Sequence, residues 1–443
     1  MRRWAHPHID AHCDARCRSM SGLSHSLYNL LVWAAQPLLR RKLARRAAAE
    51  PGYAVAVPER FGHYSQPPQA VCELVWVHAV SLGESRAAAI LIGALRECLP
   101  GVRILLTHGT ATGRAEGSKL LQPGDVQVWQ PWDTPAAVGA FLRHFRPRVG
   151  LLMETEVWPN LVLQSARAGV PLALVNARMS EKSLHAALRW PTLMRPTYAA
   201  LAAVWPQTEA DAQRLRQLGA TVQTVTGNLK FDAQPDARQV ACGQAWRAGF
   251  KRPVCLLASS REGEEAMWLQ AVQALSDDVQ WLIVPRHPQR VDEVQSLLES
   301  AGLAVSRRST WGDDGPPADA AQVWLGDSLG EMALYYSLAD VALLGGSFAP
   351  LGGQNLIEAA ACACPVVMGP HTFNFLEAAQ QAEAAGAAVR VADMAEGVRG
   401  AQRLALAADA RHAASHAALA FSQAHKGAAR RVAGLVQGLM AQG

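Results

Sequence analysis

Glu84 is the first residue whose type and position suggest chemistry. It follows the apolar segment 72–80, in Ser81-Leu-Gly-Glu84, and begins a segment of helical periodicity over 84–98. A glutamate at the end of a strand can act as a general base that deprotonates a hydroxyl. The same Ser-x-x-Glu spacing forms a capping box, which serves only the first turn of a helix. The sequence leaves both roles open for Ser81 and Glu84.

Other polar residues follow later apolar segments of the first half. The candidates there are Glu154, Glu156, Asn176, Arg178 and Lys230. Glu154 and Glu156 could bind sugar hydroxyls or assist a catalytic group, and Lys230 could bind an acidic substrate. Helix caps, core salt bridges and a solvated lysine are alternatives that the sequence leaves open.

The second half carries glycine, serine, arginine and histidine at the same kind of position. Gly345-Gly-Ser-Phe-Ala-Pro-Leu-Gly-Gly-Gln-Asn355 precedes a helical segment with Glu358. Glycines let the backbone approach a phosphate, which exposed N–H groups and a helix dipole attract. A carboxylate one turn into that helix can accept both ribose hydroxyls, so the pattern suggests a nucleotide site, although tight turns alone would also use these glycines. The candidate donor-binding residues are Ser259, Arg286, His287, Gly345, Gly346, Ser347, Gly353, Asn355 and Glu358.

Alternating apolar and helical segments must position these residues. Continuous apolar strands separated by helices predict parallel sheets covered on both faces, and hence an α/β fold of two doubly wound domains. The expected strands are 72–80, 102–107, 149–153, 172–176, 201–205, 222–226, 253–258, 279–284, 322–325, 341–345, 365–368 and 387–391. Ligands of such folds bind beyond the carboxyl ends of the strands, where the candidates lie. Segment 233–250 has the composition of a linker.

Composition narrows the class of protein. A chain of 443 residues with 50% hydrophobic residues can form two domains with cores of their own. A net charge of +5 is too small to indicate nucleic-acid binding, so we expect no nucleic-acid partner. The eight cysteines lack the paired spacing of a zinc site and are typical of a reducing compartment.

The N-terminal region predicts membrane contact. Residues 1–19 are polar and irregular, and we expect a disordered extension. Segment 27–39 is apolar with Trp33, and Arg40, Arg41, Lys42, Arg45 and Arg46 follow it. The segment is too short to span a bilayer, but an apolar face with a basic end fits a helix that lies on an anionic membrane surface over 20–49. An amphipathic core helix is the alternative.

Taken together, these segments resemble the family of Kdo (3-deoxy-D-manno-oct-2-ulosonic acid) transferases of lipopolysaccharide synthesis. The most specific matches are Glu154-Thr-Glu-Val-Trp-Pro-Asn160 and Gly227-Asn-Leu-Lys-Phe-Asp232. Further matches are Leu27-Tyr28 with Pro37, Glu59-Arg-Phe-Gly62, Trp76 through Glu84, Asn176-Ala-Arg178, Pro285-Arg-His-Pro288, Gly345-Gly-Ser347 and Gly352 through Glu358. The sequence departs from the family pattern at Ser260-Arg261, where Thr-His is expected, and at Gln354, where His is usual.

The resemblance implies a GT-B fold, in which two Rossmann-like domains face a central cleft. It implies an acceptor-binding domain over 50–236 and a domain over 237–443 that binds CMP-Kdo, with a last helix that could pack back on the first domain. Kdo would move to a lipid A precursor (lipid IVA) by an inverting displacement that needs no metal and no cofactor. The implied location is the cytoplasmic face of the inner membrane of a Gram-negative bacterium, as a peripheral or monotopic protein in contact with anionic lipid.

The resemblance also implies roles for individual residues. Glu84 would be the general base, and Lys230 and Glu154 would complete the catalytic group. Ser81, Glu156, Asn176 and Arg178 would lie on the acceptor side. Arg286, His287, Ser347, Asn355 and Glu358 would hold the CMP part, with Glu358 on the ribose.

Two other functions remain compatible with the residues. One is a GT-B transferase that uses a UDP-sugar and a membrane acceptor. The other is a non-catalytic, membrane-bound protein that has kept the fold.

Overall fold

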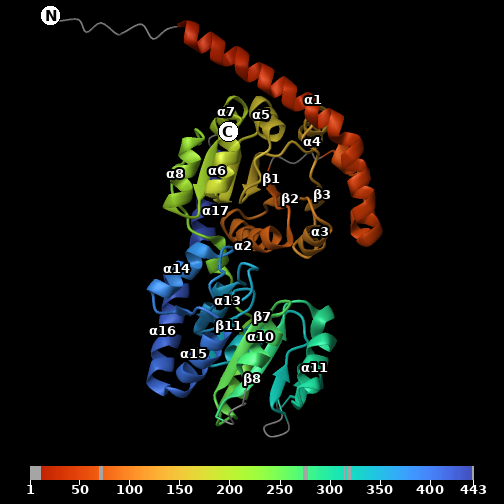
Figure 1. Cartoon of the computed structure of the whole chain (residues 1–443). Coiled ribbons are helices and arrows are strands. Elements are labelled where there is room, and N and C mark those ends of the chain that lie inside the picture. The colour runs from red at the N-terminus through yellow and green to blue at the C-terminus, as the bar shows by residue number, and fades with distance from the viewer. Residues whose placement is uncertain (1–10, 69–72, 273–277, 314, 317–320, 442–443) are drawn as a thin grey trace, which may run out of the picture. The chain divides into compact units, whose positions relative to one another are not determined.

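The computed structural model describes residues 11–68, 73–272, 278–313, 315–316 and 321–441 (Figure 1). The chain forms two compact units. Unit 1 comprises Met1–Asp232 and Gly427–Gly443, and unit 2 comprises Ala233–Lys426. The division therefore falls after Asp232, where we expected it after residue 236.

Unit 1 is built on a six-stranded parallel sheet in the order β3-β2-β1-β4-β5-β6. Its strands are β1 (Leu74–His78), β2 (Arg103–His108), β3 (Val126–Trp129), β4 (Val149–Met153), β5 (Leu172–Ala177) and β6 (Ala203–Pro206). Its helices are α1 (Ala11–Ala49), α2 (Leu82–Cys98), α3 (Ala111–Ser118), α4 (Pro135–Phe145), α5 (Pro159–Arg167), α6 (Glu181–Leu188), α7 (Pro191–Ala199), α8 (Glu209–Gln217) and α17 (Ala428–Ala441). Every residue of β1, β4 and β5 is buried, as expected of strands covered on both faces.

Unit 2 has a seven-stranded sheet, parallel in every pairing, in the order β13-β12-β11-β7-β8-β10-β9. Its strands are β7 (Val254–Ser260), β8 (Gln280–Pro285), β9 (Val305–Arg307), β10 (Val323–Leu325), β11 (Val341–Leu344), β12 (Val366–Met368) and β13 (Ala388–Arg390). Its helices are α9 (Ala237–Ala248), α10 (Glu264–Ala271), α11 (Val291–Ser300), α12 (Met332–Leu338), α13 (Leu356–Ala361), α14 (Leu376–Ala384), α15 (Met394–Leu406) and α16 (Ala408–Ala424). The predicted class, two doubly wound α/β domains, is confirmed.

Segment 222–226, expected to be a strand, has a single bridge between Val222 and Val204. The side chain of Gln223 explains why the pairing stops. Its Oε1 accepts a hydrogen bond from the Val204 N–H (3.2 Å), and its Nε2 donates to the Ala202 carbonyl (3.1 Å). A side-chain amide thus occupies the β6 backbone groups that a neighbouring strand would use. Two short strands, β3 and β9, were missed because they have only four and three residues.

Segment 233–250, expected to be a linker, contains helix α9. The Asp236 side chain caps this helix by accepting hydrogen bonds from the Arg238 and Gln239 N–H groups. The helix packs closely on α12, because a Cβ at Gly243 would lie 2.4 Å from the Leu334 carbonyl oxygen. Burial against unit 2, which composition does not reveal, makes this segment part of the domain.

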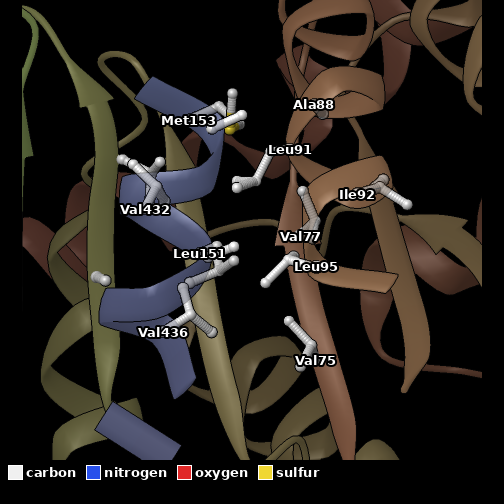
Figure 2. Packing of buried hydrophobic residues seen from close by; sticks show 14 of the residues in the cluster. Val75, Val77, Ala88, Leu91, Ile92, Leu95, Leu151, Met153, Val432 and Val436 are labelled. Carbon is white, nitrogen blue, oxygen red and sulfur yellow. The ribbon is translucent and has the colours of Figure 1, made fainter. Parts of the chain in front are cut away.

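The C-terminal helix α17 completes the core of unit 1. Val432 and Val436 pack against α2 side chains such as Leu91 and Leu95, and against Leu151 of β4 (Figure 2). The start of α17 is held by the Asp232 carboxylate, which accepts hydrogen bonds from the Gly427 and Ala429 N–H groups. The end of the chain therefore stabilises the first unit.

Helix α1 begins at Ala11, so residues 11–19, expected to be disordered, are helical in the structure. Residues 1–10 lie outside the described part. No glycine or proline interrupts 11–21, and alanine and arginine are good helix formers. None of the described helices has the length and apolar character needed to cross a bilayer.

Polar side chains in the first half of α1 form hydrogen bonds with the rest of unit 1. The Tyr28 hydroxyl donates to the Asp133 carboxylate (2.7 Å), and His25 Nε2 lies 2.8 Å from Asn160 Oδ1. Six large apolar side chains of the helix are exposed, namely Leu23, Leu27, Leu30, Leu31, Trp33 and Leu38, whereas Val32, Leu39 and Leu43 are half-buried. A core helix has the opposite arrangement, so this alternative is wrong for α1.

Candidate active site

The candidate site of unit 1, called the crevice below, is the edge of the sheet beyond the carboxyl ends of the neighbouring strands β1 and β4. The strand order reverses between these two strands, and ligands of doubly wound sheets bind beyond such a point. Glu84 follows β1 in the first turn of α2, and Glu154 and Glu156 follow β4. The topology therefore brings the three candidate carboxylates to one edge of the sheet.

Glu84 is held by the turn that begins α2. Its Oε2 accepts a hydrogen bond from the Val80 N–H (2.9 Å), and its Oε1 accepts one from the Ser81 hydroxyl (2.9 Å). The Ser81 oxygen in turn accepts the Glu84 N–H at 3.3 Å. Ser81 thus caps the helix, whereas the Glu84 side chain bonds the N–H of Val80 and not that of Ser81, so only one half of a capping box is formed. A carboxylate has about four lone-pair positions, so one bond on each oxygen leaves acceptor capacity.

The surroundings of Glu84 raise the pKa of its carboxyl group above that of an ordinary glutamate. Burial raises the pKa of Glu84, the bonds from Val80 and Ser81 oppose this rise, and the charges of Glu156 and Glu154 add to it. Burial would also raise the pKa of Glu156, but His78 and the Trp158 N–H outweigh it and lower that pKa. Two carboxylates at one edge with pKa shifts of opposite sign are typical of acid–base sites.

Lys230 and Arg178 place positive charge beside Glu154. The Lys230 Nζ lies 3.5 Å from Glu154 Oε1, and Arg178 Nη1 lies 4.0 Å from Glu154 Oε2. Glu154 has a φ of 53°, a left-handed conformation that is costly for a residue with a long side chain. Such strain is found most often at functional sites.

Asn176 fixes the segment that carries Lys230. It also has a φ of 53°, at a bulge of β5, and its Oδ1 accepts a hydrogen bond from the Leu229 N–H (3.1 Å). Its Nδ2 is buried without a hydrogen-bond partner among the described residues. The structure therefore brings Glu154, Asn176, Arg178 and Lys230 together.

The corresponding point in unit 2 lies between β7 and β11. There the backbones approach so closely that a Cβ at Gly345 would lie 2.2 Å from the Ser259 carbonyl oxygen. Only glycine fits at this position. The two loops that follow these strands, 259–265 and 345–355, are thus neighbours.

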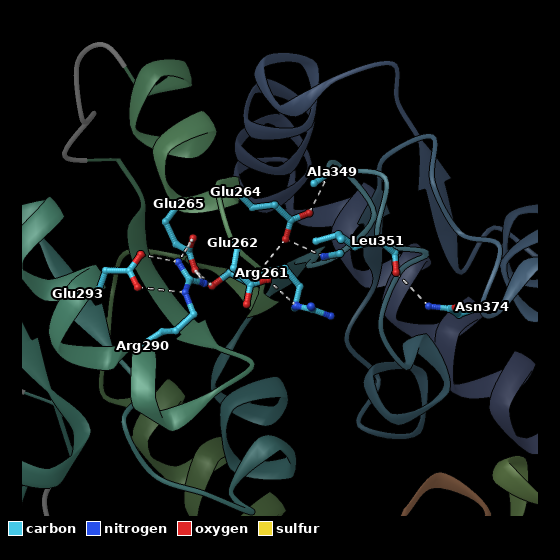
Figure 3. Close-up of polar contacts among 11 residues, drawn as sticks. Arg261, Glu262, Glu264, Glu265, Arg290, Glu293, Ala349, Leu351 and Asn374 are labelled. Atoms are coloured by element: carbon cyan, nitrogen blue, oxygen red, sulfur yellow. Dashed lines mark hydrogen bonds and ion pairs between the residues drawn. The ribbon is translucent and has the colours of Figure 1, made fainter. Parts of the chain in front are cut away.

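Glu264, which the sequence analysis did not single out, joins the two loops (Figure 3). The side chain is fully buried, and its Oε2 accepts hydrogen bonds from the N–H groups of Arg261 (2.9 Å) and Gly346 (2.6 Å). Its Oε1 accepts those of Phe348 (3.0 Å) and Ala349 (3.2 Å). The only signal in the sequence is an acidic residue in the first turn of a helix, which is common and not specific.

This arrangement changes the expectation that the glycine-rich loop offers its N–H groups to a phosphate. The N–H of Gly346 is used by Glu264, and that of Gly353 donates to the Gly346 carbonyl (2.7 Å). The Ser347 hydroxyl is buried, where it donates to Leu344 O (2.5 Å) and accepts from the Gly369 N–H (2.8 Å). The loop is therefore held by internal hydrogen bonds of Gly346, Ser347 and Gly353.

The remaining donor candidates surround this loop. Asn355 caps α13, accepting the Ile357 N–H (3.2 Å), and Glu358 lies in the first turn of that helix. Arg286 and His287 follow β8, next to β7 in the sheet, and His287 is exposed. Ser259, with a φ of 53°, ends β7. Their contacts with a nucleotide stay predictions.

Similarity to known proteins decides the family. Residues 56–233 match the family model of 3-deoxy-D-manno-octulosonic-acid transferase (kdotransferase). The 3-deoxy-D-manno-octulosonic acid transferase of Bordetella pertussis is 47% identical over 423 residues, which cover 92% of this chain and 98% of that protein. The chain belongs to the Kdo transferase family. The transferase of the same description from Haemophilus influenzae is 32% identical over 79% of this chain and 83% of its own.

Solved structures show the same fold for this Kdo transferase family member. A glycosyltransferase from Rickettsia africae covers 84% of this chain and 99% of its own at a TM-score of 0.54 with 12% identity. The UDP-GlcNAc 2-epimerase from Neisseria meningitidis covers 84% and 100% at a TM-score of 0.55 with 14% identity. The two Rossmann-like units thus have the GT-B fold. The match to the Kdo transferases of Bordetella pertussis and Haemophilus influenzae shows that the chain is a glycosyltransferase for Kdo in lipopolysaccharide synthesis. The UDP-sugar and non-catalytic alternatives are set aside on this ground.

Proposed function

We propose that this Kdo transferase moves Kdo from CMP-Kdo to a lipid A precursor, with Glu84 as the general base. The position of Glu84 carries the proposal, because its carboxylate is fixed at the crevice beside Glu154 and Glu156 with lone pairs to spare. The acceptor hydroxyl gives its proton to Glu84, and its oxygen attacks the anomeric carbon of Kdo. The bond from that carbon to the CMP phosphate oxygen breaks, CMP leaves as an anion, and the configuration inverts.

The raised pKa of Glu84 supports the role of a base. A base works best when its pKa lies nearer to the working pH, since its conjugate acid then binds the proton more firmly. The two hydrogen bonds from Val80 and Ser81 fix the direction of the carboxylate. Fixed orientation removes part of the entropic cost of reaching the reactive geometry.

The cationic side of the crevice supports an acidic sugar. Kdo carries a carboxylate, and Lys230 and Arg178 are both placed at Glu154 rather than scattered over the surface. On this proposal Glu154 positions the two cations at the edge of the sheet, and the Kdo carboxylate binds beside them. Asn176 keeps the Lys230 segment in place.

On the donor side, we propose that CMP binds against the loop that Glu264 organises. Arg286 and His287 would contact the phosphate, and Glu358 and Asn355 would contact the ribose and base. A preformed loop lowers the cost of binding because it is ordered before the nucleotide arrives. No metal and no cofactor take part in the proposed displacement.

We also propose that α1 places the enzyme on the cytoplasmic surface of the inner membrane. Its exposed apolar residues run from Leu23 to Leu38, and Arg41, Lys42 and Arg45 continue the exposed side. Apolar side chains can enter the interface while the basic turn binds anionic lipid. A lipid-linked acceptor would then be within the same interface.

Transfer of Kdo to a tetraacylated lipid A precursor in detergent, resolved by mass spectrometry, tests the reaction. Wild type should add one or more Kdo units, and Glu84→Gln should bind CMP normally but transfer nothing. The matched control is Glu181→Gln, which removes an exposed carboxylate of α6 away from the crevice and should transfer Kdo as the wild type does. Full turnover by Glu84→Gln would remove Glu84 from the mechanism, and transfer from a UDP-sugar instead of CMP-Kdo would refute the donor.

Membrane placement has a separate test. Leu27→Ser together with Leu31→Ser should reduce flotation with vesicles of phosphatidylcholine and phosphatidylglycerol, because two exposed apolar side chains are lost. Equal flotation of the variant and wild type would contradict contact through this face.

A further inference from the structure

A basic cavity lies in unit 1 where α1, α4 and α5 meet, and neither the reaction nor the family match accounts for it. Its volume is about 650 Å³. Three arginines line it, Arg143 and Arg146 from the end of α4 and Arg167 from the end of α5. Among the described residues that line the cavity there is no aspartate or glutamate. Its charge is therefore positive.

The floor of the cavity is a fixed polar surface. Asn160 is fully buried, and its Nδ2 donates to Asn29 Oδ1 (2.8 Å) while its Oδ1 lies 2.8 Å from His25 Nε2. The Asp133 carboxylate accepts hydrogen bonds from the N–H groups of Asn160 (3.0 Å) and Leu161 (2.7 Å). These bonds fix the position of Asn160 in the floor. Two residues of α1 are thus part of the wall.

Donor groups converge above this floor. A Cβ built at Gly139 would lie 3.1 Å from Arg143 Nη1 and 3.3 Å from Gln164 Oε1. The Arg143 guanidinium therefore folds back along α4 into the cavity, next to the Gln164 amide. The Nε2 of Gln164 is buried and has no hydrogen-bond partner among the described residues. A buried donor without a partner is costly unless a ligand or water satisfies it.

We propose that this cavity binds the phosphate group of an anionic lipid headgroup. Guanidinium groups bind phosphate oxygens through paired hydrogen bonds, and three of them line the cavity. The helix that supplies His25 and Asn29 also carries the exposed apolar face from Leu23 to Leu38. A lipid whose chains lie along that face has its headgroup at the level of the cavity. The headgroup site rests on the proposed membrane contact of α1 and is independent of sugar transfer.

Binding of the full chain to vesicles, without donor or acceptor, tests the headgroup site. Vesicles of phosphatidylcholine with and without phosphatidylglycerol serve as probes. Arg143→Gln combined with Arg167→Gln should weaken binding to the anionic vesicles by roughly tenfold or more, since each basic residue near an anionic leaflet contributes appreciably. The matched control is Arg399→Gln combined with Arg430→Gln, which removes the same charge at exposed positions outside the cavity.

A second variant separates a built site from general charge attraction. Gly139→Leu places an apolar side chain beside Arg143 and Gln164 in the cavity and leaves the charge unchanged. The atoms it would meet are the ends of two flexible side chains, and leucine favours a helix more than glycine does, so the fold should persist. It should weaken binding to anionic vesicles and leave binding to phosphatidylcholine alone unchanged.

The outcomes are distinct. An equal loss in the control pair, or no loss in Gly139→Leu, would overturn the headgroup site. Thermal stabilisation of the wild type by inorganic phosphate alone, absent from the Arg143→Gln and Arg167→Gln variant, would assign the cavity to a soluble anion and overturn the lipid assignment. A failure of the α1 proposal would appear instead as unchanged flotation when Leu27 and Leu31 are replaced.

Discussion

Replacing Glu264 with glutamine should open the loop that the proposed donor binds. The substitution keeps the size of the side chain but replaces one carboxylate oxygen by an NH₂ group. Each oxygen of Glu264 now accepts two backbone N–H groups, so whichever oxygen is replaced leaves two N–H groups facing another donor. The two bonds on the remaining oxygen also lose their charge assistance.

The size of the effect follows from these bonds. A hydrogen bond to a charged group contributes about 1.5–3 kcal/mol, so loss of two costs about 3–6 kcal/mol. That is a large share of the roughly 5–15 kcal/mol that stabilises a typical folded domain. At about 1.4 kcal/mol per tenfold, local opening should become more frequent by roughly two to four orders of magnitude.

Hydrogen exchange measured by mass spectrometry, together with CMP binding by calorimetry, reports both consequences. Peptides that contain Gly346, Phe348 and Ala349 should exchange much faster in Glu264→Gln, and CMP affinity should fall. The control is Glu262→Gln, whose side chain is 54% exposed and forms an ion pair with Arg261 (3.0 Å). A surface pair of this kind contributes less than about 1 kcal/mol. If both variants exchange and bind CMP alike, Glu264 does not organise the loop.

Three further predictions concern the crevice and the ribose. Ser81→Ala removes a hydrogen bond that lowers the pKa of Glu84, so this pKa should rise further. The acid limb of kcat/KM should then move to higher pH, and an unmoved limb would contradict Glu84 as the titrating base. Lys230→Met should raise KM for CMP-Kdo and leave CMP affinity unchanged, because we assign the Lys230 cation to the sugar carboxylate. An equal loss of affinity for CMP-Kdo and for CMP would refute that assignment. Glu358→Ala should weaken CMP binding by roughly tenfold or more, since a hydrogen bond to a charged group is lost, and unchanged affinity in calorimetry would exclude the ribose contact.

The sequence by itself determined the fold class, most strands and the edge at which the candidates lie. Segment 149–153 is a strand with those bounds in the structure, and the Ser81 side chain caps α2 by accepting the Glu84 N–H, as their spacing allows. These features depend on periodicity and on contacts between residues close in the chain. Both can be read without a tertiary structure.

Other features depended on contacts between distant residues. Gln223 ends the β6 pairing with a side chain, and Gly243 lets α9 pack on α12, so an expected strand and an expected linker were wrong. Glu264 became important only because folding brings residues 346–349 to its carboxylate.

The outward face of α1 was decided in the same way. Its sequence is compatible with a core helix, but buried polar partners such as Asp133 and Asn160 draw Tyr28 and His25 inward, because buried hydrogen-bonding groups need partners. Six large apolar side chains of the helix are left exposed as a result. Local pattern thus fixed which elements form, whereas long-range hydrogen bonds and packing fixed which side chains each element presents.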